Sequence, residues 1–259
     1  MRKVLFTCSV ILMLIPAWNN TNAQCCGAEW WLQQMVQSGI YGGYGIKYYN
    51  PKGFNNYIDA YNQIHASTLK IKMDNFGTAM GFKVGANLAQ ARFDRFLVGI
   101  KVDYHQTNEK HSATADVTPG VRATREFDLT LRTFGAGLSA TYLLTENLHL
   151  KFLELMMTWN SGKLINKYSD PATSKEEKLS TDEASLGYSA GAGLIFYLLP
   201  PYVAIEGTVG YSSFSNEKMQ FENSGPYLTQ LPNGGDIMTN FVESGGLFGF
   251  VQLNLAFPL

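Results

Sequence analysis

The chain has 259 residues, of which 46% are hydrophobic, 13% aromatic and only 16% charged, against about 25% charged in an average soluble protein. Its 16 Phe, 14 Tyr and 4 Trp are too many for a disordered chain. A net charge of −1 and a pI near 6.4, with no basic stripe, argue against nucleic-acid binding. Beyond residue 17 the longest apolar run is Leu194 to Leu199, far short of the about 20 residues of a membrane-spanning helix. With 25 glycines, the composition favours a sheet in which apolar residues alternate with small or polar ones.

The first residues have the pattern of an export signal. Arg2 and Lys3 precede a mostly apolar stretch, residues 4–17, and small residues occupy both cleavage-site positions of Thr21-Asn22-Ala23. This pattern predicts a secretory signal peptide over residues 1–23. We expect residues 24–38 to form a periplasmic N-terminal segment.

Two adjacent cysteines, Cys25 and Cys26, follow the predicted cleavage site. No third metal-ligating group lies near them in the sequence, so zinc binding is not expected. A vicinal disulfide or two free thiols is the expectation, and a lipid-anchored cysteine is the alternative.

Eight later segments alternate apolar residues with small or polar ones at the period of a strand. They cover residues 40–48, 76–88, 95–105, 127–142, 148–159, 185–198, 203–212 and 247–257. The fourth and fifth segments each slip by one residue, which we interpret as β-bulges. All prolines from Pro51 to Pro232 lie between segments, as expected because proline cannot donate to a central ladder.

The connections between the segments alternate in length. Short connections lie near residues 90–94, 145–147 and 200–201, and long ones at 49–74, 108–124, 166–184 and 213–245. Short turns on one side and long loops on the other are typical of barrels in outer membranes. We therefore predict an all-β fold over residues 39–259: an eight-stranded antiparallel up-and-down transmembrane β-barrel with both termini in the periplasm.

Two features favour apolar side chains that face lipid. Glycines are frequent on the polar face of the segments, where a narrow interior needs room. Aromatic residues lie at the ends of the apolar face, as in the aromatic girdles of membrane barrels. The predicted girdle comprises Tyr48, Phe76, Tyr104, Phe127, Trp159, Tyr188 and Tyr211 near the long loops, and Tyr142, Phe196 and Phe257 near the short turns.

The inward face carries charges of both signs in similar number. Because an unpaired buried charge is costly, we expect these residues to form structural ion pairs in the lumen. They are Lys83, Lys101, Asp103, Arg132, Lys151, Glu154 and Glu206. Eight strands leave an interior that side chains roughly fill, so no large pore is expected. A gated ion path is the alternative.

Aromatic residues also recur in two long loops. In the first loop, Phe54, Tyr57, Ile58, Tyr61 and Ile64 fall on one side of an amphipathic helix. The fourth loop is unusually apolar for a wet surface. We predict possible ligand or partner contacts at Phe54, Tyr57, Tyr61, Phe221, Tyr227 and Phe241. Packing of these loops against each other is the alternative.

No constellation of residues identifies a catalytic or metal site. The four histidines lack metal-site spacing, so neither a metal nor a cofactor is expected. An enzyme alternative would need Asp103, His105, His111 and Ser112 to meet at the outer rim. The charge run over 170–183 is interpreted as solvated, with a calcium site as the alternative.

The signal ending Ala23-Gln24, the eight alternating segments and the closing Phe257-Pro258-Leu259 together resemble small outer-membrane β-barrel proteins of Bacteroidetes-type bacteria. These are relatives in shape of the OmpA, OmpX and OmpW barrels. The resemblance implies export to the outer membrane of a Gram-negative bacterium, a lipid bilayer with lipopolysaccharide as surroundings, and assembly machinery that recognises the C-terminal strand.

A non-enzymatic structural or surface-interaction role is the resulting expectation. The alternatives are OmpW-like binding or passage of a small hydrophobic molecule, an accessory barrel of a secretion or envelope machine with an envelope protein as partner, and a lipid-modifying enzyme.

Overall fold

The computed structural model describes residues 35–118, 121–181, 183–222 and 240–258. The predicted signal peptide, Cys25, Cys26 and Tyr227 lie outside the described residues.

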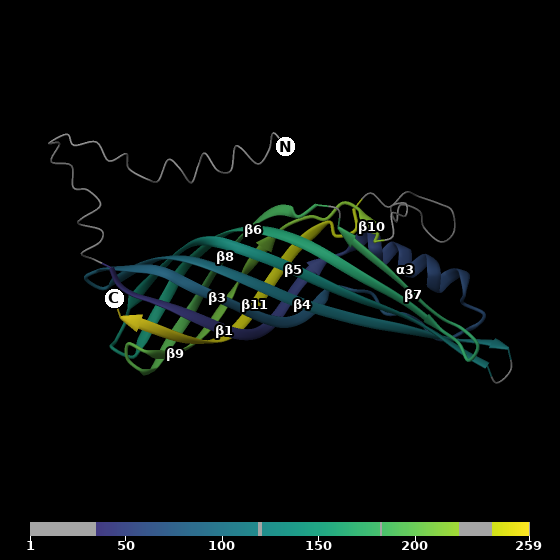
Figure 1. Ribbon diagram of the computed structural model, residues 1–259, viewed down its shortest axis with the longest axis horizontal. Coiled ribbons are helices and arrows are strands. Elements are labelled where there is room, and N and C mark those ends of the chain that lie inside the picture. Colours follow the sequence, from purple (N-terminus) through teal and green to yellow (C-terminus); the bar gives the residue numbers. More distant parts are fainter. Residues whose placement is uncertain (1–34, 119–120, 182, 223–239, 259) are drawn as a thin grey trace. The chain divides into compact units, whose positions relative to one another are not determined.

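Eight antiparallel strands form a closed ring (Figure 1). In ring order each strand pairs with the next, and β11 pairs with β1 to close the barrel. The predicted eight-stranded antiparallel barrel is therefore confirmed. The strands are β1 (Met35–Asn50), β3 (Thr78–Phe93), β4 (Phe96–Thr118), β5 (Val121–Leu143), β6 (Leu148–Ser169), β8 (Ser185–Leu199), β9 (Val203–Ser213) and β11 (Ser244–Pro258).

The two ends of the barrel differ in construction. At one end, β3–β4, β5–β6 and β8–β9 are joined by turns of a few residues, and we call this the short-turn end. The C-terminus lies at this end (Figure 1). In the first turn Asp94 has a φ of 53°, a left-handed conformation that aspartate tolerates better than most residues.

At the opposite, long-loop end, several strands continue well beyond the ring. The expected loop over 108–124 is instead a strand hairpin, because β4 and β5 pair from Phe96–Tyr142 out to Thr118–Val121. Most of the expected loop over 166–184 is likewise strand. The added elements are α3 (Lys52–Ile64), β2 (Leu69–Ile71), which pairs with β4, β7 (Ser174–Thr181), which pairs with β6, and β10 (Met219–Phe221), which pairs with β7.

The helix predicted in the first long loop is α3, between β1 and β2. Phe54, Ile58 and Tyr61 are buried as its amphipathic pattern predicts, whereas Ile64 at its end is 47% exposed. Within the ranges that the structure describes, no helix is both long and apolar enough to cross a membrane.

One of the two predicted bulges, the one in β5, is absent. Its pairing with β4 has no shift between Ala115–Ala123 and Phe96–Tyr142, so the strand keeps one facing throughout. Phe127 and Leu131 therefore point inward and are buried, and Arg132 points outward. In β6 the predicted slip is confirmed, since its register shifts between Lys151 and Glu154.

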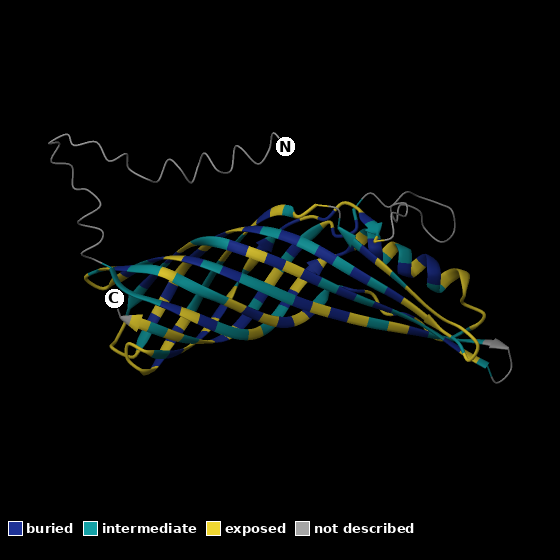
Figure 2. Cartoon of the chain, in the orientation of Figure 1, coloured by how far each residue is buried: buried dark blue, intermediate teal, exposed yellow. Residues whose placement is uncertain are grey.

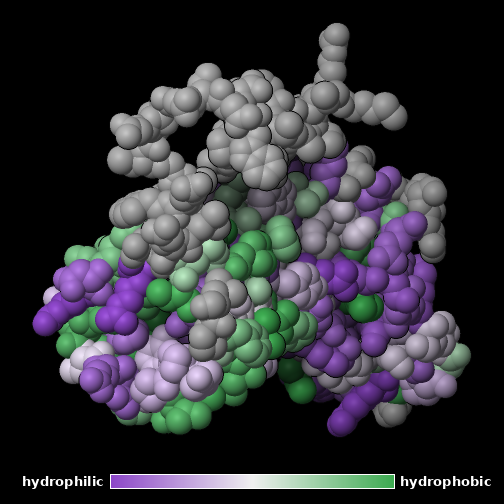
Figure 3. Space-filling model, turned by 60° about the vertical axis from the view of Figure 1, so that its left-hand side comes forward, coloured by the Kyte–Doolittle hydropathy of each residue, from purple (hydrophilic) through white to green (hydrophobic). Residues whose placement is uncertain are grey.

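An exposed apolar belt surrounds the ring, where exposed and buried residues alternate along each strand (Figure 2). Hydrophobic groups gather in patches on the space-filling surface (Figure 3). Two aromatic levels bound the belt on β4 and β5: Phe96 against Tyr142, with ring centroids 5.2 Å apart, and Tyr104 paired in register with Phe134. These levels lie about 27 Å apart along the strand and about 21 Å apart at a strand tilt of about 40°, close to the about 25 Å apolar band of membrane barrels.

The belt predicts a dependence of stability on depth. Leu138 lies midway between the aromatic levels and is 56% exposed, whereas Leu144 lies in a short turn and is 44% exposed. We expect Leu138→Arg to lower the free energy of unfolding in a bilayer by about 2–4 kcal/mol, and Leu144→Arg by about 0–1 kcal/mol. Reversible urea unfolding in lipid vesicles measures both, and equal losses would contradict a lipid-facing belt.

Candidate functional site

Six charged side chains meet in the middle of the lumen, and each is no more than 4% exposed. We call them the ion cluster: Lys83, Lys101, Asp103, Lys151, Glu154 and Glu206. Lys83 Nζ lies 3.4 Å from Asp103 Oδ2 and 3.5 Å from Glu154 Oε1. Lys151 Nζ lies 2.7 Å from Glu154 Oε2 and also pairs with Glu206, while Lys101 pairs with Glu154. Three ammonium groups thus face three carboxylates, which leaves this desolvated cluster formally neutral.

Neighbouring polar and aromatic groups extend the cluster to other strands. Asn254 Nδ2 of β11 donates to Glu206 Oε2 at 2.8 Å. The Tyr41 ring of β1 lies 4.8 Å from Lys101 Nζ, a cation–π distance. His105 Nε2 lies 3.2 Å from Asp103 Oδ1. Charges on β3, β4, β6 and β9 are thereby held together with groups on β1 and β11 across the whole width of the barrel.

Glycines on the inward face leave the space that these long side chains occupy. A Cβ added at Gly135 would lie 2.5 Å from Asp103 Oδ1, and one added at Gly85 would lie 2.5 Å from Tyr41 Cζ. Side chains at these two positions would collide with the cluster. The inward glycines therefore provide the space that the long charged side chains fill.

Three of the residues predicted by sequence lie elsewhere. Arg132 is exposed on the outer face and is not a lumen residue. Phe76 and Phe127, expected in the girdle, are 4% and 2% exposed and belong to an inner core. The cause for Arg132 and Phe127 is the facing of β5, which does not invert. The other predicted girdle residues are exposed or partly exposed: Tyr48, Tyr104, Tyr142, Trp159, Tyr188, Phe196, Tyr211 and Phe257.

Above the ion cluster, toward the long-loop end, lies a boundary layer around Lys47. This side chain is 3% exposed, and its Nζ donates to Thr133 Oγ1 at 3.3 Å. Its ammonium group lies 4.2 Å from the ring centroid of Phe214. Thr133 in turn donates to Asn160 Oδ1 at 2.9 Å. At this level the buried lysine contacts a hydroxyl group and an aromatic ring, whereas the lysines of the ion cluster contact carboxylates.

Beyond this layer the space between the extended strands is filled by a hydrophobic core, which we call the cap core. Phe54 of α3 lies at its centre, with ring centroids 4.6 Å from Phe241, 5.1 Å from Phe76 and 5.3 Å from Phe127. Leu129, Leu164 and Met219 contribute from β5, β6 and β10 and are fully buried. The core therefore closes the long-loop end of the barrel.

Two asparagines attach α3 to the segment that leads into β3. Asn55 Nδ2 donates to Phe76 O and its Oδ1 accepts from Phe76 N, both at 2.9 Å. Asn62 makes the same pair of bonds with Met73, at 2.8 and 3.0 Å. The spacing of seven residues places both amides on one side of the helix. Nothing in the sequence pattern of the helix indicated this role.

Glu109 anchors the start of β3 from the neighbouring strand. Its carboxylate accepts hydrogen bonds from Thr78 N at 2.7 Å, from Gly77 N and from the Tyr49 hydroxyl at 2.6 Å. Burial, together with the charge of Glu109, raises the pKa of the Tyr49 phenol, which keeps that hydroxyl protonated and able to donate.

The aromatic residues predicted as ligand or partner contacts are mostly interior. Phe54, Tyr61 and Phe241 are buried in the cap core, and Tyr57 and Phe221 pack partly buried against it. The Arg125 guanidinium lies 4.9 Å from the Tyr61 ring and 5.0 Å from the Phe127 ring. In the described part of the chain, this packing corresponds to the alternative in which the two loops pack against each other.

The residues of the enzyme alternative do not come together as a triad. Asp103 and His105 face the ion cluster, whereas His111 lies 2.9 Å from Glu109 Oε1 and packs against Phe76. Ser112 is exposed on the other face of β4. Strand parity places Ser112 on the opposite face of β4, and His111 lies six residues along the strand from His105 on the same inward face.

No protein-family model and no curated protein matches the chain. Among solved structures it is similar to Ail, the attachment invasion locus protein of Yersinia pestis, at 13% identity and a TM-score of 0.38, over 86% of this chain and 99% of that one. The neisserial surface protein A matches at 11% identity and a TM-score of 0.36, over 86% and 97% of the two chains. The outer membrane protease OmpT from Escherichia coli matches at 9% identity and a TM-score of 0.40, over 87% and 95%. The barrel assignment rests on the strand pairing and the apolar belt described above.

The ion cluster yields a prediction about stability. Lys101→Met would leave two ammonium groups against three carboxylates in a desolvated space, so we expect a loss of about 3–5 kcal/mol in the free energy of unfolding. Lys178→Met removes a surface charge whose Nζ lies 3.1 Å from Glu176 and should change stability little. Urea unfolding compares the two variants. A Lys101 variant as stable as the Lys178 variant would contradict a coupled cluster.

Proposed function

We propose that this protein is a non-conducting integral barrel of a Gram-negative outer membrane that presents a rigid, folded extension at the cell surface. Its role is structural or one of surface interaction, without catalysis. The observation that carries the proposal is that the barrel is filled at two levels: the ion cluster occupies the middle of the lumen and the cap core closes the long-loop end.

The filled lumen supports the non-conducting part. Directly beside the ion cluster, on the side of the short-turn end, the described side chains leave a cavity of about 30 Å³, which has room for only a few water molecules. Water and hydrated ions would have to separate paired charges and then cross the cap core. Both steps are costly in a desolvated interior.

The extension supports the surface role. Its outer faces carry opposite charges in pairs, such as Lys110 with Glu126 at 2.8 Å and Lys167 with Glu176 at 3.7 Å. Its inner faces are apolar and buried by α3. A charged shell around an aromatic core suits a rigid platform in water above the membrane.

The proposal places the short-turn end in the periplasm and the extension outside the cell, next to lipopolysaccharide. The amphipathic β11, with Phe257 52% exposed, is the segment that we assign to recognition by the outer-membrane assembly machinery. This arrangement matches the resemblance to barrels of Bacteroidetes-type bacteria.

The alternative of OmpW-like passage for a hydrophobic molecule needs a lateral opening with apolar walls. Near Ser185, where β6 parts from β8 and pairs with β7, the described residues line a cavity of about 490 Å³. Most of its lining is polar, including Glu183, Asn216 and Glu217. The observed lining therefore favours the closed barrel over lateral passage.

Conductance tests the closed lumen. We expect the purified protein in a planar bilayer to give no stable openings, because the ion cluster and the cap core both block the path. A porin purified and reconstituted in the same way serves as the positive control. Stable, high-conductance openings of the unmodified protein would move the assignment to a channel.

Orientation is tested with an inserted protease site. Insertion between Pro171 and Ala172, in the exposed turn joining β6 to β7, should be cleaved when protease is added to intact cells. The same insertion at Asn147, in a short turn, should be cleaved only after the outer membrane is permeabilised. The reverse pattern would overturn the proposed orientation.

A further inference from the structure

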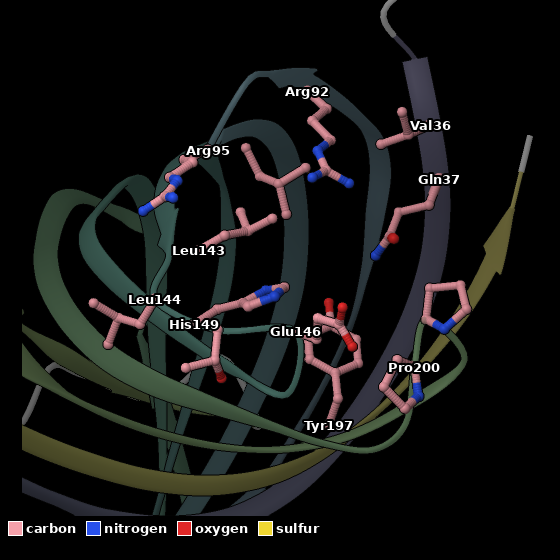
Figure 4. Close-up of a pocket in the computed structure, with 13 residues that line it drawn as sticks. Val36, Gln37, Arg92, Arg95, Leu143, Leu144, Glu146, His149, Tyr197 and Pro200 are labelled. Carbon is pink, nitrogen blue, oxygen red and sulfur yellow. The ribbon is translucent and has the colours of Figure 1, made fainter.

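An open cavity of about 590 Å³ lies at the short-turn end, away from the cap core (Figure 4). Its volume is within the range of small-molecule binding sites. Apolar side chains and the two prolines of the β8–β9 turn form much of the wall. The apolar lining is Val36, Leu97, Leu143, Leu144, Pro200 and Pro201.

A buried imidazole forms the floor of this cavity. His149 is 6% exposed, and its Nδ1 is buried without a hydrogen-bond partner among the described residues. The ring packs on Tyr197, with centroids 4.6 Å apart, which holds its orientation. A polar group buried without a partner is costly, so a ligand that supplied one would gain from the interaction.

Cationic groups stand at the mouth above the imidazole. Arg92 Nε donates to Asp94 O at 3.0 Å, and its guanidinium points into the opening toward His149 (Figure 4). Arg95 also lines the cavity, and Glu146 is its one acidic lining residue. The charged lining is therefore cationic by one unit.

The cavity is blind. The polar layer at its inner end leaves only about 30 Å³, and the ion cluster lies beyond that layer. Gln37 and Tyr197 line both this small space and the open cavity. A molecule that enters from the short-turn end therefore has no path through the barrel, so the cavity is suited to binding and not to transport.

We propose that this cavity is a binding site for a small organic carboxylate that carries an apolar group. The Arg92 guanidinium binds the carboxylate, the His149 imidazole contributes a hydrogen bond from the floor, and the leucine and proline side chains bury the apolar group. Arginine is suited to this task because its planar guanidinium matches a carboxylate in geometry.

The test uses two probes of nearly the same shape, of which only one carries a negative charge. N-acetyl-leucine has a free carboxylate and N-acetyl-leucinamide does not, and both are water-soluble enough to stay out of the lipid. Titration of each into the full-length protein in lipid nanodiscs, followed by ligand-observed NMR, gives the two Kd values. We expect the carboxylate to bind at least tenfold more tightly than the amide, and inorganic phosphate to bind more weakly than the carboxylate because it lacks the apolar group.

Variants with opposite expected effects on affinity test which residues of the cavity bind the carboxylate. Arg92→Gln should weaken binding of N-acetyl-leucine about tenfold or more, and His149→Phe, which keeps the ring on Tyr197, severalfold. Glu146→Gln removes the opposing charge and should tighten binding. Arg122→Gln, at the far tip of β5, should change nothing.

Far-UV circular dichroism checks that each variant is folded. Equal affinity for acid and amide, phosphate binding as tight as that of the acid, or an Arg92 variant that binds like the unmodified protein would each overturn the proposed site.

Discussion

Unbroken strand parity in β4 and β5 is the constraint on which the rest of the structure depends. β4 and β5 each run for 23 residues, and their pairing keeps every second side chain on the inward face from the short turn nearly to the tip. The inward-facing residues of each strand therefore lie in two different surroundings, one within the lipid belt and one above it. Within the lipid belt the outside is apolar and the inside polar, whereas above it the outside meets water and the inside must be apolar.

The layers of the interior follow from this constraint. Level with the belt, the inward face of β4 carries Lys101 and Asp103, which pair with Glu154 of β6 and Lys83 of β3. Higher up, the same face carries Leu129 and Phe127, which need a partner surface, and α3 supplies it through Phe54. Lys47 lies at the junction, with a hydroxyl and an aromatic ring as neighbours. Filling the lumen and closing the long-loop end are thus consequences of one strand pattern.

Much of this was predictable from sequence, because alternation within the belt is strong and the short turns are well marked. Six of the seven proposed lumen charges lie in the ion cluster. Arg132 was misplaced because apolar Phe127 and Leu129 were assumed to face lipid, whereas they face the cap core. Local alternation cannot reveal where the membrane ends and the polarity of the two faces exchanges. The two hydrogen bonds between the Asn55 side chain and Phe76 could not be predicted either, because their partner is main chain, which any residue type supplies.

Hydrogen exchange along β5 tests most directly whether the extension is a folded continuation of the barrel. In nanodiscs, amides of residues 123–131 should be protected to a degree comparable with those of residues 135–142, because both stretches are paired on two sides and enclose packed cores. Exchange of 123–131 within seconds, with 135–142 still protected, would contradict the account and leave a barrel with a mobile loop in place of the cap core.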